Sequence, residues 1–185
     1  MKTVLLAREI LTPLDRIQNG VVMFEDGCIL EVGSRDCIET PQGCRVIDLG
    51  EAIIAPGFID LHIHGAAGRD VMEGDDDALE AVESLIAKHG VTSYCPTTVT
   101  AAMDETLRSL GKLGHFIERM ASHGAANNGR ARPLGVHLEG PFLADSRRGV
   151  HPPAHLQAPS IKLFHEMWTA AIGRVWRRRS RNSGF

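Results

Sequence analysis

The chain has 185 residues, of which 43% are hydrophobic and 23% charged, and its formal net charge is −3. This is the composition of an ordinary globular protein with enough apolar residues for a core. No apolar run approaches the ~20 residues that cross a bilayer, and the run after Met1 is too short for a secretory signal peptide. We therefore expect a cytoplasmic protein with no membrane partner.

Residues 1–55 consist of short strand-like segments and turns, with the clearest hairpin signal at Asp26-Gly27. Apolar segments at Val21–Glu25 and Cys28–Val32 flank this pair, and both turn positions need a positive φ. Two further strand-like segments follow, Val46–Leu49 and Ala52–Ile54. The sequence predicts a small all-β unit over these 55 residues.

After Pro56-Gly57 the pattern changes to an alternation of strands and helices. Three apolar segments predict strands, the first of them buried. These segments are Phe58–His64, Val91–Cys95 and Leu134–Glu139. Because a helix lies between each strand and the next, the strands should run parallel and be joined by right-handed crossovers.

Three segments carry apolar residues at helical spacing. The first predicted helix begins at the acidic residues 75–77 and stops at Gly90, a residue suited to the left-handed conformation beyond a helix end. Thr100 is the predicted cap of the second helix, and the third begins after Ser160. The apolar stripe of the third helix is Ile161, Phe164, Trp168 and Ile172.

An open doubly wound sheet and a (β/α)8 barrel both begin with this alternation. The barrel is favoured because polar residues gather where the predicted strands end, which is where barrel active sites lie. These polar residues are His62, His64, Cys95 to Thr98 and Glu139. No G-x-G-x-x-G follows the first strand, which weakens a dinucleotide-binding interpretation. We predict an α/β protein with a barrel over residues 56–175.

His62 and His64 are the first candidate metal ligands. On a strand, residues i and i+2 point to the same side, so the two imidazoles should lie together at the mouth of the barrel. Neutral imidazole is a common ligand of zinc and of other first-row divalent ions. The alternative is a pair of structural histidines.

Glu139 is the third candidate ligand. It ends an apolar strand, and Gly140-Pro141 stop that strand abruptly. A carboxylate in such a place is costly to bury unless it is paired or coordinates a cation. The alternative is a surface glutamate or an ion-pair partner. With two histidines projecting from another strand of the same barrel, a shared divalent metal is the simpler interpretation.

A family resemblance makes this interpretation specific. Pro56–Gly65 resembles the first-strand signature of the amidohydrolase superfamily. His137–Phe142, with Arg148–Pro152 following, is similar to a narrower family, the N-acetylglucosamine-6-phosphate deacetylases. Gly90–Thr97 also resembles the second strand of that family.

The resemblance implies a fold and an activity. The family has a (β/α)8 barrel with a small β-sandwich, part of which comes from the N-terminal segment, here residues 1–55. Its members hydrolyse the acetamide of N-acetylglucosamine 6-phosphate and release acetate and glucosamine 6-phosphate. The implied partner is this small-molecule amino-sugar phosphate, and the full-length family member is expected to be a homodimer.

The resemblance also implies roles for single residues. Glu139 corresponds to the glutamate metal ligand of the family, and His62 and His64 match an H-x-H pair that some members retain as ligands. His151, with the Val150 backbone, matches the position that contacts the substrate near its scissile amide. No catalytic residue is identifiable, because the aspartate of the family belongs to a later strand.

The chain departs from the family in its length and its final residues. A complete barrel takes ~250 residues and eight strands, whereas residues 56–175 supply three predicted strands. We therefore expect an incomplete barrel with open sheet edges, which folds poorly or aggregates and has no turnover alone. Residues 176–185 form an aberrant basic tail, which a frameshift or a premature end of the reading frame would explain.

Other functions remain open. Amidohydrolases that act on cyclic amides share the H-x-H signature, but not H-L-E-G-P-F with the downstream G-x-H. The chain could also be a non-catalytic remnant, or a fragment that pairs with another polypeptide. Nucleic-acid binding by the basic tail is disfavoured, because the rest of the chain is acidic, and we expect no nucleic-acid partner.

Overall fold

The computed structural model of the chain describes residues 1–122 and 129–175. The chain divides into two units, Met1–Gly57 and Phe58–Phe185. The predicted basic tail at 176–185 lies outside the described residues. Among the helices of the described ranges, none is long and apolar enough to span a membrane.

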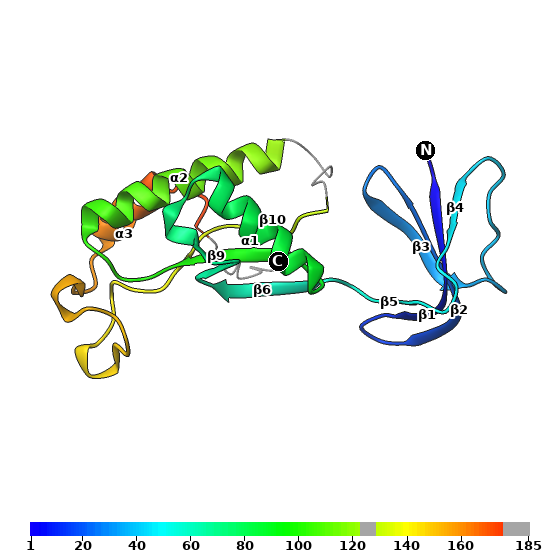
Figure 1. The fold of residues 1–185 in the computed structure, drawn as a ribbon, viewed down its shortest axis with the longest axis horizontal. Coiled ribbons are helices and arrows are strands. Elements are labelled where there is room, and N and C mark those ends of the chain that lie inside the picture. The colour runs from blue at the N-terminus through cyan, green and yellow to red at the C-terminus, as the bar shows by residue number, and fades with distance from the viewer. Residues whose placement is uncertain (123–128, 176–185) are drawn as a thin grey trace, which may run out of the picture. The chain divides into compact units, whose positions relative to one another are not determined.

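The first unit is a five-stranded sheet (Figure 1). Its strands are β1 (Thr3–Leu11), β2 (Arg16–Glu25), β3 (Cys28–Ser34), β4 (Arg45–Asp48) and β5 (Ile53–Ile54). The order is β3-β2-β1-β4, with β5 also paired to β1; β4 and β5 run parallel to β1, and the other pairs are antiparallel. Asp26 and Gly27 join β2 to β3 with φ of 50° and 78°, which confirms the predicted hairpin. This single sheet supplies one layer, and the β-sandwich stays a prediction.

The second unit contains a small parallel sheet around β9 (Val91–Thr98). On one edge, β9 pairs with β6 (Phe58–Ile63). On the other edge it pairs in succession with β10 (Arg132–Pro133) and β11 (His137–Leu138), so the third predicted strand is broken into two short pieces. Val136 also forms a parallel bridge to Val175. The strands therefore lie side by side in chain order, as they do in a barrel.

A short hairpin links β6 to the first helix. Its strands are β7 (Gly65–Ala66) and β8 (Arg69–Asp70), and a 3-10 turn follows at Val71–Glu73.

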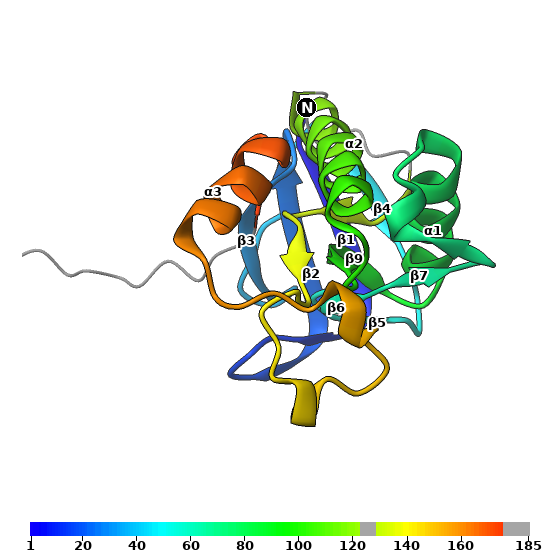
Figure 2. The ribbon, with the colours of Figure 1, turned by 90° about the vertical axis from the view of Figure 1, so that its left-hand side faces the viewer.

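Three helices lie together on one side of the parallel strands (Figures 1 and 2). They are α1 (Asp76–Lys88), α2 (Met103–Ser122) and α3 (Ile161–Ala170). Asp75 caps α1 by accepting from the Ala78 N–H, and Ser160 caps α3. Gly90, with a φ of 83°, follows α1 as expected from the sequence.

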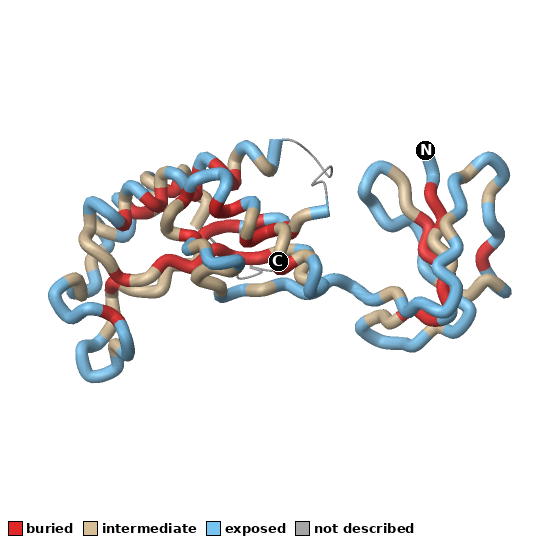
Figure 3. Tube along the Cα trace, in the orientation of Figure 1, coloured by how far each residue is buried: buried red, intermediate tan, exposed pale blue. Residues whose placement is uncertain are grey.

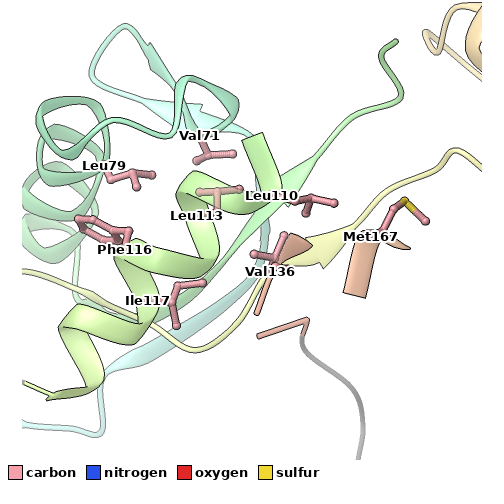
Figure 4. Packing of buried hydrophobic residues seen from close by; sticks show 9 residues of the cluster. Val71, Leu79, Leu110, Leu113, Phe116, Ile117, Val136 and Met167 are labelled. Atoms are coloured by element: carbon pink, nitrogen blue, oxygen red, sulfur yellow. The ribbon is translucent and has the colours of Figure 1, made fainter. Parts of the chain in front are cut away.

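The core of the second unit lies between these helices and the sheet. Figure 3 shows buried segments along β9 and along the helices above it. Figure 4 shows side chains from all three helices meeting in one apolar cluster. Its buried members are Val71, Leu79, Leu110, Leu113, Phe116, Ile117, Val136, Met167 and Ala171. The cluster anchors β11, and with it the residue that follows, Glu139.

Two predictions about apolar faces were wrong. The strand β6 is not buried, since Phe58 is 70% and Ile59 57% exposed; in the described residues β6 pairs with β9 alone. The predicted stripe of α3 is also misplaced. Ile161 is 79% exposed, while Met167 is fully buried, because α3 turns the face carrying Met167 and Ala171 toward α2.

The predicted helix cap at Thr100 was wrong as well. The helix α2 begins at Met103, and the Thr100 hydroxyl instead lies 2.8 Å from Nδ1 of His151.

Candidate metal centre

Two histidines lie together at the end of β6. Ile63, between them, packs against the apolar cluster of α1 and β9 that includes Val82 and Tyr94. Because side chains alternate along a strand, His62 and His64 point away from that cluster, to the sheet face opposite the helices. Their Nε2 atoms are 3.0 Å apart.

Glu139 reaches the same point from the other side of β9. It directly follows β11, and its backbone N–H donates to the Thr98 carbonyl at 3.3 Å. Its Oε2 lies 3.4 Å from Nε2 of His62 and 3.0 Å from Nε2 of His64. The structure thus brings together all three residues that the sequence selected as candidate ligands, each half-buried or exposed on the open face.

The spacing of the three ligand atoms fits a divalent ion. In a tetrahedral site with metal–ligand bonds of about 2.0–2.1 Å, ligand atoms lie about 3.3–3.4 Å apart. The corresponding separations in this chain are 3.0 to 3.4 Å. Two histidines and one glutamate are also a donor set that catalytic zinc sites use.

The hydrogen bonds of His64 leave the correct nitrogen free for a metal. Its Nδ1 lies 3.0 Å from the Thr97 carbonyl oxygen, which can only accept a hydrogen bond. The neutral ring therefore carries its proton on Nδ1, and the lone pair of Nε2 faces Glu139. Metal-bound histidines are commonly oriented in this way.

His151 lies beside the same carboxylate, although it comes from a loop after β11. It is 6% exposed, and its Nδ1 accepts from the Thr100 N–H at 3.2 Å. The neutral ring must then be protonated on Nε2, which lies 3.5 Å from Oε1 of Glu139. The neighbouring Val150 is 93% exposed. The predicted substrate contacts of these two residues stay predictions.

His137 also lies at this site, although it was not among the ligands predicted from the sequence. Its ring centroid lies 5.1 Å from that of His62, and its Nδ1 lies 3.3 Å from the Thr97 hydroxyl. Burial lowers the pKa of His137, and the nearby His62 lowers it further, which favours the neutral ring. The i, i+2 spacing from Glu139 could have indicated it, since both side chains leave the strand on one side.

Arg148 organises the loop that carries His151. Its guanidinium donates to the His151 carbonyl at 2.8 Å and pairs with Asp145 at 3.2 Å. The Arg148 side chain therefore joins two parts of this loop, at Asp145 and at His151.

Comparisons with known sequences and with solved structures both identify deacetylases of amino-sugar phosphates as similar to this chain. The chain is 38% identical over 123 residues to N-acetylglucosamine-6-phosphate deacetylase of Bos taurus, a match that covers 65% of this chain and 28% of that protein. A variant of N-acetyl-D-glucosamine-6-phosphate deacetylase from Mycobacterium smegmatis, solved in complex with N-acetyl-D-glucosamine-6-phosphate, matches 94% of this chain and 42% of its own, with 26% identity and a TM-score of 0.79. The chain resembles the N-terminal part of these deacetylases.

Another relative is named for a different sugar phosphate. The chain is 30% identical over 175 residues to N-acetylgalactosamine-6-phosphate deacetylase of Escherichia coli O157:H7, covering 95% of this chain and 41% of that protein. No family model matches the chain. The chain spans between 28% and 42% of the length of these three deacetylases.

Proposed function

We propose that His62, His64 and Glu139 hold one divalent metal ion, zinc or another first-row ion, in a metal-dependent hydrolase. The observation that carries this proposal is the set of 3.0 to 3.4 Å separations among the three ligand atoms. Three ligands from two strands leave a fourth position open on the sheet face opposite the helices, which is the arrangement of catalytic rather than structural zinc sites.

The proposed reaction is hydrolysis of the acetamide of N-acetylglucosamine 6-phosphate to glucosamine 6-phosphate and acetate. The resemblance to the deacetylases supports this choice. In amide hydrolysis a divalent ion supplies an activated water and polarises the carbonyl. The part played by this chain is a hydrogen bond from Nε2–H of His151 to the amide oxygen as negative charge develops there. The Val150 backbone lies beside it for a second contact with the substrate.

The second unit is proposed to be the first part of a (β/α)8 barrel over residues 56–175, after a β-sandwich segment at 1–55. Parallel strands in chain order and helices on one side of them support this architecture. Residues from later strands complete such a site, so we propose that this polypeptide has no turnover alone. The partner is the small-molecule substrate, and the complete enzyme is proposed to be a cytoplasmic homodimer.

Two other substrates are alternatives for the proposed metal centre. N-acetylgalactosamine 6-phosphate differs at one hydroxyl, and the Escherichia coli relative favours it as an alternative. A cyclic amide is the second alternative.

Metal binding can be measured on the 185-residue chain itself. Titration with Zn²⁺ against a chromophoric chelator should give one site, and Glu139→Gln should weaken it strongly, because a neutral amide replaces the anionic ligand. Glu105→Gln, on the exposed side of α2, removes the same charge elsewhere and should leave the affinity unchanged. Equal affinities for both variants would refute the metal centre.

The substrate can be tested in a complete barrel. In a chimera, residues 58–175 replace the matching segment of the Bos taurus deacetylase. We expect this chimera to release acetate from N-acetylglucosamine 6-phosphate, and the same chimera with Glu139→Gln to release none. A folded, zinc-loaded chimera that hydrolyses only N-acetylgalactosamine 6-phosphate or a cyclic amide would overturn the proposed substrate and retain the metal centre.

A further inference from the structure

Thr97 lies at the point where the three strands of the metal centre meet. It is fully buried near the end of β9, between β6 and β11. Its hydroxyl contacts three groups at hydrogen-bond distance. They are the Ile63 N–H at 3.0 Å, the Cys95 carbonyl at 3.0 Å and Nδ1 of His137 at 3.3 Å.

These contacts use the whole hydrogen-bonding capacity of one hydroxyl. A threonine hydroxyl has one proton to donate and two lone pairs to accept with. With the proton given to the Cys95 carbonyl, the lone pairs receive the Ile63 N–H and the Nδ1–H of His137. A buried hydroxyl whose donor and acceptor positions are all occupied is held firmly in place. Moving it would leave several buried polar groups without hydrogen-bond partners.

The backbone explains why β6 needs this hydroxyl. The ladder between β6 and β9 shifts register between Asp60 and Ile63, where Ile63 comes to lie opposite Pro96. The regular pairing of β6 with β9 is therefore interrupted between Asp60 and Ile63, a span that includes His62. The hydroxyl of Thr97 supplies the acceptor for the Ile63 N–H at this place.

The same residue also fixes a ligand directly. The Thr97 carbonyl holds Nδ1 of His64 at 3.0 Å. The peptide between His62 and His64 is therefore held by the hydroxyl, and the ring of His64 by the carbonyl, of one buried residue. Displacement of Thr97 would move both histidines relative to Glu139.

We propose that Thr97 is the positioning residue of the metal centre, and that its hydroxyl sets the metal affinity by holding the Ile63 amide between the two histidine ligands. This inference rests on the proposed metal site. Thr97 touches no ligand atom of that site through its hydroxyl, so it acts through the backbone of β6 and not as a ligand.

The test compares variants of the 185-residue chain in Zn²⁺ titrations. Thr97→Val removes the hydroxyl at constant side-chain volume and should weaken Zn²⁺ binding about tenfold to a hundredfold, as losses of outer-sphere partners do. Thr97→Ser keeps the hydroxyl and should bind as the unsubstituted chain does. Thr97→Ala removes the hydroxyl without placing a methyl group against polar neighbours, and serves if the valine variant does not fold.

A matched control lies at the other end of the same strand pair. The Thr92 hydroxyl also joins β9 to β6, by donating to the Phe58 carbonyl at 3.4 Å. Thr92→Val makes the same chemical change away from the histidines, and should leave Zn²⁺ affinity unchanged.

A second measurement follows the backbone without metal. Hydrogen exchange of the Ile63 amide in the metal-free chain should be slow, and faster in Thr97→Val and Thr97→Ala than in Thr97→Ser. Equal Zn²⁺ affinity in all folded Thr97 variants would overturn this inference and leave the proposed function standing. Absence of Zn²⁺ binding by the unsubstituted chain would overturn the proposed function and this inference with it.

Discussion

Replacing Glu83 with glutamine should flatten the pH dependence of the stability of the second unit. Glu83 lies on α1 and is fully buried. Its Oε1 accepts from the Tyr94 hydroxyl at 3.1 Å, and its Oε2 lies 3.6 Å from Nε of Arg130. Both neighbours lower the pKa of Glu83, but burial outweighs them and raises that pKa from 4.5 to about 7.

The size and sign of the effect follow from this pKa. Between pH 4.5 and about 7 the folded chain binds more protons at Glu83 than the unfolded chain does. The stabilisation is therefore fully present below pH 4.5 and is lost as the pH rises to about 7. A pKa difference of this size corresponds to about 3 kcal/mol of unfolding free energy. Glutamine cannot ionise and keeps an acceptor for Tyr94, so Glu83→Gln should lack this loss.

Urea unfolding at several pH values measures the effect. Trp168 lies in α3 of the second unit, so its fluorescence reports on the part that holds Glu83. Contributions of other groups to the pH dependence of the unfolding free energy are common to the variant and the unsubstituted chain, so they cancel in the difference. Glu80→Gln is the comparison, since Glu80 also pairs with Arg130 but is half exposed. It should keep most of the pH dependence, because burial is the largest cause of the raised pKa of Glu83 and Glu80 adds only a smaller part. Identical pH profiles for Glu83→Gln and the unsubstituted chain would refute the reasoning.

Three further substitutions test the packing and the ends of the helices. A Cβ at Gly114 would lie 2.7 Å from the backbone of Ala171, so Gly114→Ala should destabilise the second unit by about 1–3 kcal/mol in urea unfolding. Gly111→Ala on the same helix meets nothing closer than 3.9 Å and should stabilise by up to about 1 kcal/mol; the reverse order would contradict the observed packing of α3 on α2. Asp75→Ala removes the acceptor of the Ala78 N–H and should cost about 1 kcal/mol, and an unchanged urea midpoint would count against this cap.

Much of the local structure could be predicted from the sequence because it depends on near neighbours. The Asp26-Gly27 turn needs only residues that tolerate a positive φ, and the start of α1 is indicated by the acidic residues 75–77 alone. The choice of His62 and His64 as a pair followed from side-chain alternation along one strand. Glu139 was selected from its place at a strand end.

Only the tertiary structure decided which groups meet. Thr100 suits a helix cap by its local pattern, yet its backbone and hydroxyl bind His151, 51 residues away. The face that α3 buries depends on the shape of α2, and so the apolar stripe read from its own sequence pointed the wrong way.

The metal centre shows the same division. The sequence alone indicated the three proposed ligands and the strands that carry them, because each indication depends on a few consecutive residues. It did not indicate the role proposed for Thr97, whose contacts with Ile63, His64 and His137 join residues 33 to 40 positions apart in sequence. Whether Glu139 would come within 3.4 Å of both histidines was settled by the parallel pairing of β6 and β11 with β9, since only that pairing brings the ends of separate strands to one edge of the sheet.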